Sequence, residues 1–256
     1  MSTFSKVAYN SKAYAQFRPS YTNKLYRTIY DFHKGGYSRA LDVATGTGQV
    51  TKALSSKFEQ VHGIDISETM LSQATKGDNI TYSIGSAEQL PFEDASVDLI
   101  TVAQGAHWFN TKIEGSSEKV RNSVEELGVN PVKLGNNWEA GREILDNFYR
   151  DSGWEELHNE FSHVLRYESP RKDASALDIP DDNIFIQLRS MEVWRFREYL
   201  KTWSSYKQYK EANLPGDLVD ECVDSIKKEY NPRTPLKEDD VLPLSWPQVL
   251  LLASNR

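Results

Sequence analysis

The chain has 256 residues, with 30 Lys and Arg against 37 Asp and Glu, so its formal net charge is −7. This acidity argues against a nucleic-acid-binding protein, because neutralising phosphates needs a basic surface. The longest purely apolar run covers residues 249–253, far short of the roughly 18 residues of a membrane span, and the first 17 residues show no signal peptide. A single cysteine, Cys222, excludes an internal disulfide and fits a reducing compartment. We therefore expect a cytoplasmic protein with neither a nucleic-acid nor a membrane partner.

Strand-like and helix-like segments alternate over the first 110 residues. Short apolar runs predict buried strands at residues 39–44, 60–64, 80–84 and 97–103. Helical spacing predicts helices at residues 21–33, 49–58 and 67–75, the last with Ser67 as its N-cap. Such alternation is typical of βαβ units, so we expect an α/β fold with a Rossmann-like, mostly parallel sheet and flanking helices.

The pattern changes after residue 110. Residues 111–130 are mostly polar and carry no strand signal, whereas residues 161–167 predict a strand, followed by a polar loop to residue 183. Helices are expected at residues 141–150, 154–157, 193–209, 217–230 and 243–253. The aromatic residues Trp194, Trp203 and Tyr206 have helical spacing, for which core packing is the favoured role.

A glycine-containing turn follows the first predicted strand, in the segment LDVATGTGQVT at residues 41–51. Gly46 and Gly48 allow a tight turn and a close approach of the backbone to a ligand. A dinucleotide motif would need a third small residue where Thr51 stands, so the spacing disfavours nicotinamide dinucleotides. The remaining pattern suits a ligand with an amino acid moiety, whose carboxylate meets the loop and whose ammonium lies toward Asp42.

Polar residues also follow the second and third predicted strands. Asp65 comes 19 residues after Gly46, the spacing at which an acidic residue accepts hydrogen bonds from ribose hydroxyls. Residues 86–88 (Ser-Ala-Glu) present a backbone N–H and a side-chain acceptor to an adenine edge, although a simple connecting loop is the alternative. Ligands bind at the carboxyl ends of strands in open α/β sheets, so these residues predict one site.

Together these segments resemble the class I S-adenosylmethionine-dependent methyltransferases. LDVATGTGQVT, VHGIDISETML, IGSAEQLPFEDASVDLITV and AHWF follow one another in that family's order over residues 40–109. Within the family, the segment YAQFRPSY and residues 106–109 look most like the fungal and bacterial trans-aconitate methyltransferases. The resemblance implies transfer of the methyl group of S-adenosylmethionine to a small-molecule acceptor, such as a carboxylate of trans-aconitate.

The resemblance implies a cofactor site formed by residues that precede and follow these strands: Tyr14, Asp42, Ala44, Gly46, Gly48, Asp65, Ile66, Met70, Ser86, Ala87, Glu88 and Gln104. Ala44 stands where the family usually has glycine, and its methyl group is tolerable if its φ is negative. Ser86 replaces a frequent Asp, so adenine recognition would depend more on backbone groups and Glu88.

Arg18 is the leading candidate for a carboxylate clamp that acts on either the substrate or the cofactor, with a helix-end ion pair as the alternative. His107 is the candidate catalytic residue, as a base or as a donor to a carboxylate, unless it is simply a packed histidine. Further substrate-side candidates are Tyr9 as part of an N-terminal lid and Trp108 as a wall of the substrate pocket. Trp138 and Arg142 are candidates in a segment further along the chain. The five histidines show no metal-ligand spacing, so no metal is expected.

We expect a single methyltransferase domain over residues 1–256, with a cap at 1–37, a cofactor-binding half at 38–110 and a helical and antiparallel substrate-covering half at 111–256. The family continues after the fourth strand with a helix and a fifth strand, which are not recognisable here, so a segment near residues 110–112 is either absent or shortened. That departure and Ala44 support an alternative: a non-catalytic relative that binds S-adenosylmethionine and acts as an interaction module. The oligomeric state is left open.

Overall fold

The computed structural model describes residues 10–18, 20–87, 89–93, 95–103, 112–113, 134, 158–159, 161–168, 186–230, 233–247 and 249–255. The chain divides into two compact units, residues 1–107 and 108–256. This division falls close to residue 110, where the sequence pattern changes.

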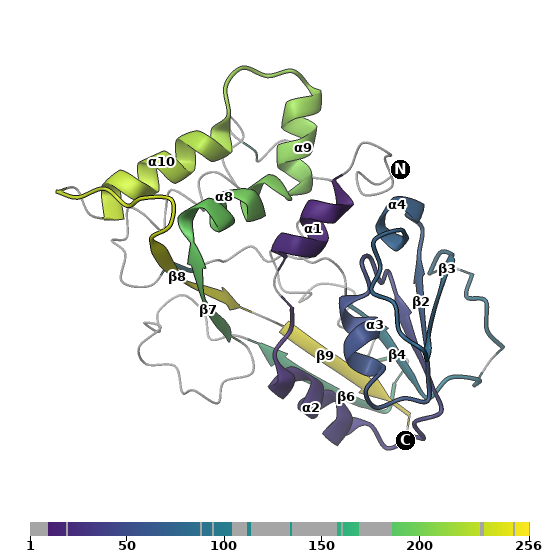
Figure 1. Ribbon diagram of the computed structural model, residues 1–256. Helices are drawn as coiled ribbons and strands as arrows, with labels where there is room; N and C mark the ends of the chain where they lie inside the picture. Colours follow the sequence, from purple (N-terminus) through teal and green to yellow (C-terminus); the bar gives the residue numbers. More distant parts are fainter. Residues whose placement is uncertain are drawn as a thin grey trace. The chain divides into compact units, whose positions relative to one another are not determined.

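The first unit contains a four-stranded parallel sheet (Figure 1). Its strands stand in the order β3-β2-β1-β4 and match the four predicted segments: β1 Arg39–Val43, β2 Gln60–Asp65, β3 Ile80–Ile84 and β4 Leu99–Val102. In register, Asp42 of β1 lies between Gly63 of β2 and Thr101 of β4, and Gly63 faces Tyr82 of β3. These four residues share one face of the sheet because parallel partners in register point the same way.

The described part of this unit also contains four helices: α1 Ser11–Phe17, α2 Asn23–Phe32, α3 Gln49–Leu54 and α4 Glu68–Leu71. The predicted N-cap of α4 is confirmed, since the Ser67 hydroxyl accepts a hydrogen bond from Met70 N. Helix α3 ends earlier than predicted. The hydroxyls of Ser55 and Ser56 donate to the carbonyl oxygens of Lys52 and Ala53, and such local bonds compete with helix continuation.

The opposite face of the sheet carries an apolar cluster. Leu41, Val43 and Ile64 are buried there, and Leu90, Phe92 and Val97 from the β3–β4 connection pack against them. In the part of the chain that the structure describes, β4 pairs only with β1, and Val102 is 59% exposed.

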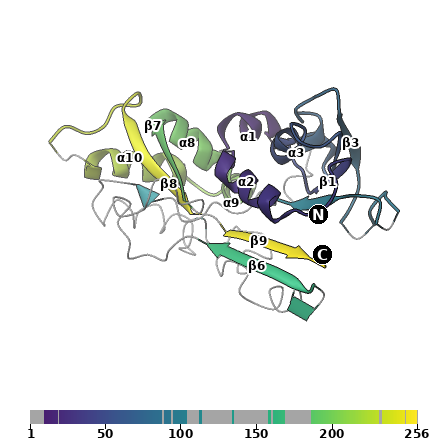
Figure 2. The same cartoon turned by 90° about the horizontal axis from the view of Figure 1, so that it is seen from below.

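The described strands of the second unit form two antiparallel groups. β5 (Lys112–Ile113), β8 (Val241–Pro247) and β7 (Ile186–Glu192) form one sheet in that order. β6 (His163–Glu168) and β9 (Val249–Ser254) form the other, and they run side by side in Figure 2. The strand predicted at residues 161–167 is thus confirmed, whereas β5 and β7 were not expected. The helix predicted at 243–253 is wrong: Pro247 would stand in its interior, where proline removes a backbone hydrogen bond, and the segment supplies part of β8 and β9 instead.

The second unit also contains three consecutive helices: α8 Val193–Lys201, α9 Ser204–Glu211 and α10 Leu218–Tyr230. The single helix predicted over 193–209 is broken, because Trp203 adopts an extended conformation with ψ 138° and the Thr202 hydroxyl bonds back to Tyr199 O. Trp203 is buried as expected, but Trp194 is 38% exposed, and the Tyr206 hydroxyl donates to Asp217. The helix expected over 217–230 is confirmed as α10.

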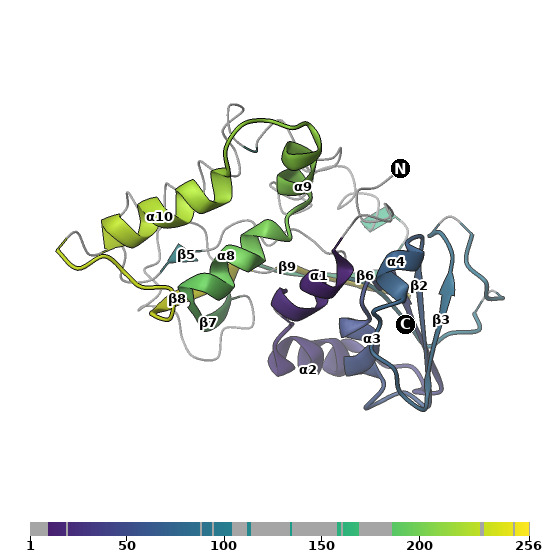
Figure 3. The same ribbon diagram turned by 45° about the horizontal axis from the view of Figure 1, so that its top comes forward.

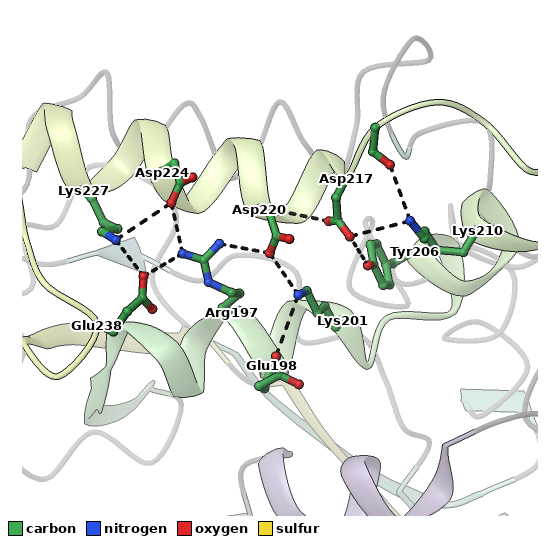
Figure 4. Close-up of polar contacts among 11 residues, drawn as sticks. Arg197, Glu198, Lys201, Tyr206, Lys210, Asp217, Asp220, Asp224, Lys227 and Glu238 are labelled. Carbon is green, nitrogen blue, oxygen red and sulfur yellow. Dashed lines mark hydrogen bonds and ion pairs between the residues drawn. The ribbon is translucent and has the colours of Figure 1, made fainter.

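An ion-pair network joins α8, α10 and the segment before β8 (Figure 4). The Arg197 guanidinium donates to Asp220 at 3.0 Å, Asp224 at 3.0 Å and Glu238 at 2.9 Å. Lys201 pairs with Asp220 at 2.9 Å, and Lys227 pairs with Glu238 at 2.6 Å. The network therefore links two helices and a loop through one largely buried cation.

Among the described residues, no helix is both long and apolar enough to cross a membrane. The helices expected at residues 141–150 and 154–157, and the polar loop expected after residue 168, lie outside the described residues.

Candidate cofactor site

The turn between β1 and α3 has a left-handed backbone at three positions. The φ angles are 56° at Ala44, 57° at Gly46 and 76° at Gly48. Glycine adopts this region freely, whereas an alanine there is strained. The condition of a negative φ at Ala44 is therefore not met. Because the residue is exposed, its methyl group adds no packing clash, but the backbone strain remains.

Asp42 lies beneath this turn, almost completely buried. Its Oδ2 accepts hydrogen bonds from the Thr45 hydroxyl (2.7 Å), the Thr51 hydroxyl (2.7 Å) and Thr51 N (3.1 Å), and its Oδ1 accepts one from the Thr101 hydroxyl at 2.8 Å. Burial raises the pKa of Asp42, and the threonine hydrogen bonds counteract that rise. Both carboxylate oxygens are thus engaged inside the fold, in contrast to the expectation that Asp42 faces a ligand ammonium.

Asp65 ends β2 and contacts the same turn from the neighbouring strand. Its Oδ2 accepts a hydrogen bond from Gly46 N at 2.8 Å, and its Oδ1 accepts one from Ser67 N at 2.8 Å. Each carboxylate oxygen has two lone pairs, so Asp65 can accept further hydrogen bonds from ligand hydroxyls. The next residue, Ile66, is 55% exposed and offers apolar surface at the same strand end.

Helix α1 lies beside α3 and α4 in Figures 1 and 3. Tyr14 of α1 and Met70 of α4 form a small buried cluster. A Cβ built on Gly46 would lie 3.4 Å from Met70 Cε, so the cluster adjoins the turn. The Arg18 guanidinium lies 4.8 Å from the centre of the Tyr14 ring. The segment before β1 is therefore brought to the glycine turn.

The third strand end approaches the second. Gly85 N donates to Asp65 O at 3.1 Å, and Ser86 forms an isolated β-bridge with Gln89. Ser86 is half-buried and Ala87 is exposed, directly after β3. These residues stand where the sequence places an adenine-binding segment.

The structure thus brings together, in the first unit, the predicted residues Tyr14, Arg18, Asp42, Ala44, Gly46, Gly48, Asp65, Ile66, Met70, Ser86 and Ala87. The remaining predicted site residues lie outside the described part of the chain: Tyr9, Glu88, Gln104, His107, Trp108, Trp138 and Arg142. Their roles stay predictions.

Sequence reasoning missed the residues that hold the turn in place. Thr45, Thr51 and Thr101 bind the Asp42 carboxylate, and Tyr82 packs against Gly63. The threonines carry no pattern of their own. Gly63 did carry a signal, because a glycine inside a strand marks a bulge or a close approach of another group.

Comparison with known proteins agrees with this geometry. Residues 41–127 match the family described as "Methyltransferase domain". A Dictyostelium discoideum protein assigned as a methyltransferase is 26% identical, covering 96% of this chain and 93% of that protein. CRG1 of Saccharomyces cerevisiae, named as an S-adenosylmethionine-dependent methyltransferase, is 25% identical and covers 86% of this chain and 88% of its own length.

A solved structure assigned as a type II methyltransferase, from Anaeromyxobacter dehalogenans, shares the fold of this chain. The TM-score is 0.65 at 22% identity, covering 93% of this chain and 97% of that one. The expected α/β class, with a mostly parallel sheet and flanking helices, is confirmed.

Proposed function

We propose that this chain is an S-adenosylmethionine-dependent methyltransferase that methylates a small-molecule acceptor on a carboxylate oxygen, with a polycarboxylate such as trans-aconitate as one substrate. The observation that carries the cofactor half of the proposal is the left-handed turn at residues 44–48, fixed to the Asp65 carboxylate at the end of β2. The acceptor half rests on Arg18 and on the resemblance of the segment YAQFRPSY and residues 106–109 to the trans-aconitate group.

The cofactor is S-adenosylmethionine, and the residues of the turn fit it. A side chain at Gly46 would be strained by its φ of 57° and would approach Met70, so the turn leaves backbone uncovered at this strand end. Gly46, Gly48 and the neighbouring backbone would hold the amino acid moiety, and Asp65 the ribose hydroxyls. When bound, S-adenosylmethionine would supply a sulfonium methyl group for in-line transfer to a nucleophile, with the sulfur leaving as the neutral thioether of S-adenosylhomocysteine.

A carboxylate acceptor suits the residues that the structure brings to this site. A carboxylic acid is already ionised at neutral pH, so its oxygen attacks without a general base and no proton needs to move. The chain then has to orient the acceptor and neutralise its remaining charge. Arg18, buried beside Tyr14, supplies a planar guanidinium that matches a carboxylate bidentately.

Calorimetric titration with S-adenosylmethionine tests the cofactor half. Asp65→Ala removes the acceptor that holds Gly46 N and the ribose, so the Kd should rise at least about tenfold, equivalent to roughly 1.4 kcal/mol. The matched control is Asp78→Ala in the exposed turn before β3, which should bind as the unaltered protein does. Equal Kd values for the Asp65 variant and the control would contradict the assignment.

A transfer assay with methyl-labelled cofactor tests the acceptor half. We expect label to enter di- and tricarboxylic acids and to be released as methanol by mild alkali, which cleaves methyl esters but not N- or C-methyl groups. Phenols and amines serve as the comparison panel. Label only in that panel would overturn the carboxylate proposal. Tight cofactor binding with no transfer to any acceptor would favour the interaction module.

A further inference from the structure

A glycine inside β2 is packed against an aromatic ring. A Cβ built on Gly63 would lie 2.7 Å from both Cδ1 and Cε1 of Tyr82 and 3.0 Å from Thr45 Cγ2. The backbone of Gly63 does not require glycine, because its φ lies outside the left-handed region. The ring of Tyr82 is therefore what excludes a side chain from this position.

The far end of the same tyrosine reaches the glycine turn. A Cβ on Gly48 would overlap the Tyr82 hydroxyl and lie 2.9 Å from its Cζ. The hydroxyl donates to Thr75 O at 2.9 Å, and Thr75 N in turn donates to Thr47 O at 3.2 Å. Burial raises the pKa of Tyr82 to about 12, so the hydroxyl stays protonated and remains a donor at neutral pH.

The turn is thus held from two sides. Asp42 and Asp65 bind its hydroxyls and N–H groups from the strand ends. Tyr82 contacts it at Gly48 and, through Thr75, at Thr47. Three of the five residues at 44–48 have a left-handed backbone. Contacts that fix this loop in its binding conformation should raise its affinity for a ligand, because the loop then loses less conformational entropy on binding.

We propose that Tyr82, seated on Gly63, is a positioning residue that sets the conformation of residues 45–48 for cofactor binding. The proposal rests on the proposed function, in which this turn binds S-adenosylmethionine. Tyr82 acts through the turn, so its loss should change the affinity for the cofactor and the KM for it, with little change in kcat.

A double-mutant cycle tests the packing of the ring on Gly63. Gly63→Ala places a methyl group against the ring and should raise the Kd for S-adenosylmethionine about tenfold. Tyr82→Ala removes the ring and should raise it by a similar factor. In the double variant the methyl group no longer meets a ring, so its Kd should be at least about fivefold lower than the product of the two single effects predicts.

Two further variants separate positioning from stability. Tyr82→Phe keeps the ring but loses the bond to Thr75, and should weaken binding by about two- to tenfold with little change in Tm. Gly77→Ala is the matched control, since its Cβ would also press on a side chain, Ile80 Cδ1 at 2.8 Å, away from the turn. It should lower Tm without altering the Kd.

The outcomes distinguish this proposal from the one on which it rests. If the unaltered chain does not bind S-adenosylmethionine, the proposed function fails. If the unaltered chain binds but folded Gly63→Ala has an unchanged Kd, the role of Tyr82 is overturned. It is also overturned if the change in Kd of the double variant equals the product of the changes in Gly63→Ala and Tyr82→Ala. Should Gly63→Ala not fold, Tyr82→Ala and Tyr82→Phe decide: unchanged Kd values in both overturn the proposal.

Discussion

Ala44 has the same left-handed backbone as Gly46 and Gly48 but carries a methyl group. The left-handed conformation costs a residue with a Cβ roughly 1–2 kcal/mol, partly offset by the greater unfolded-state freedom of glycine. We therefore expect Ala44→Gly to raise the free energy of unfolding by about 1 kcal/mol, measured by urea denaturation. Affinity for S-adenosylmethionine should be kept or improved.

The same substitution in α3 is the control for Ala44. Ala53 has a right-handed helical backbone, where glycine is less stable than alanine by roughly 0.5–1 kcal/mol. Ala53→Gly should thus lower the free energy of unfolding. A loss of stability in both variants would show that the backbone at Ala44 is not strained.

At the level of single residues, the sequence predicted positions at the site but not all of their contacts. The positions of Asp42 and Asp65 followed from the ends of two predicted strands, and both lie at the glycine turn. The role expected for Asp42 differs from its contacts, because its partner Thr101 lies 59 residues away and no local pattern announces that hydrogen bond. Tyr82 was missed for the same reason: its ring crosses to a neighbouring strand.

At the scale of elements, the sequence predicted strands well where continuous apolar runs stood between helices. It failed at residues 243–253, because a short apolar run has no period that separates a buried strand from a helix. Pro247 carried the missing information, since it would stand in the interior of that helix. The break between α8 and α9 was also missed, since the aromatic spacing continues across Thr202 and Trp203 while the backbone does not.

The network around Arg197 predicts how the stability of the α8–α10 region depends on pH. Partial burial alone would raise the pKa of Asp220, but hydrogen bonds and charges from Lys201 and Arg197 leave it below its ordinary 3.8. Hydrogen bonding from Lys227 and Arg197 lowers the pKa of Glu238 below 4.5, against a smaller effect of burial. A carboxyl group whose pKa is lowered in the folded state contributes its full stabilisation when the pH is above its ordinary pKa. This stabilisation is lost as the pH falls through the lowered pKa.

Arg197→Met should therefore lower the free energy of unfolding by about 2 kcal/mol at pH 7 and by less near pH 3, measured by denaturation at both pH values. Lys228→Gln is the control, because Lys228 is an exposed cation of α10 for which the structure describes no ion pair. An equal effect of Arg197→Met at both pH values would contradict a stabilising role of the ionised carboxylates.

At the scale of the whole molecule, the proposed cofactor contacts all lie in the unit of residues 1–107. A ligand that binds only the folded state adds about 2.7 kcal/mol at a concentration of 100 times its Kd. Hydrogen exchange should accordingly slow by at least tenfold at the amides of residues 44–48 and 65–70 when S-adenosylmethionine is added. The amides of α10 in the other unit serve as the internal reference and should change less. In Asp65→Ala, a tenfold higher Kd turns the same cofactor concentration into about ten times the variant's Kd, so the added stability should fall to about 1.4 kcal/mol and the slowing at the turn should be about tenfold smaller. Protection that is equally strong in α10, or that is undiminished in the Asp65 variant, would move the cofactor contacts away from the strand ends.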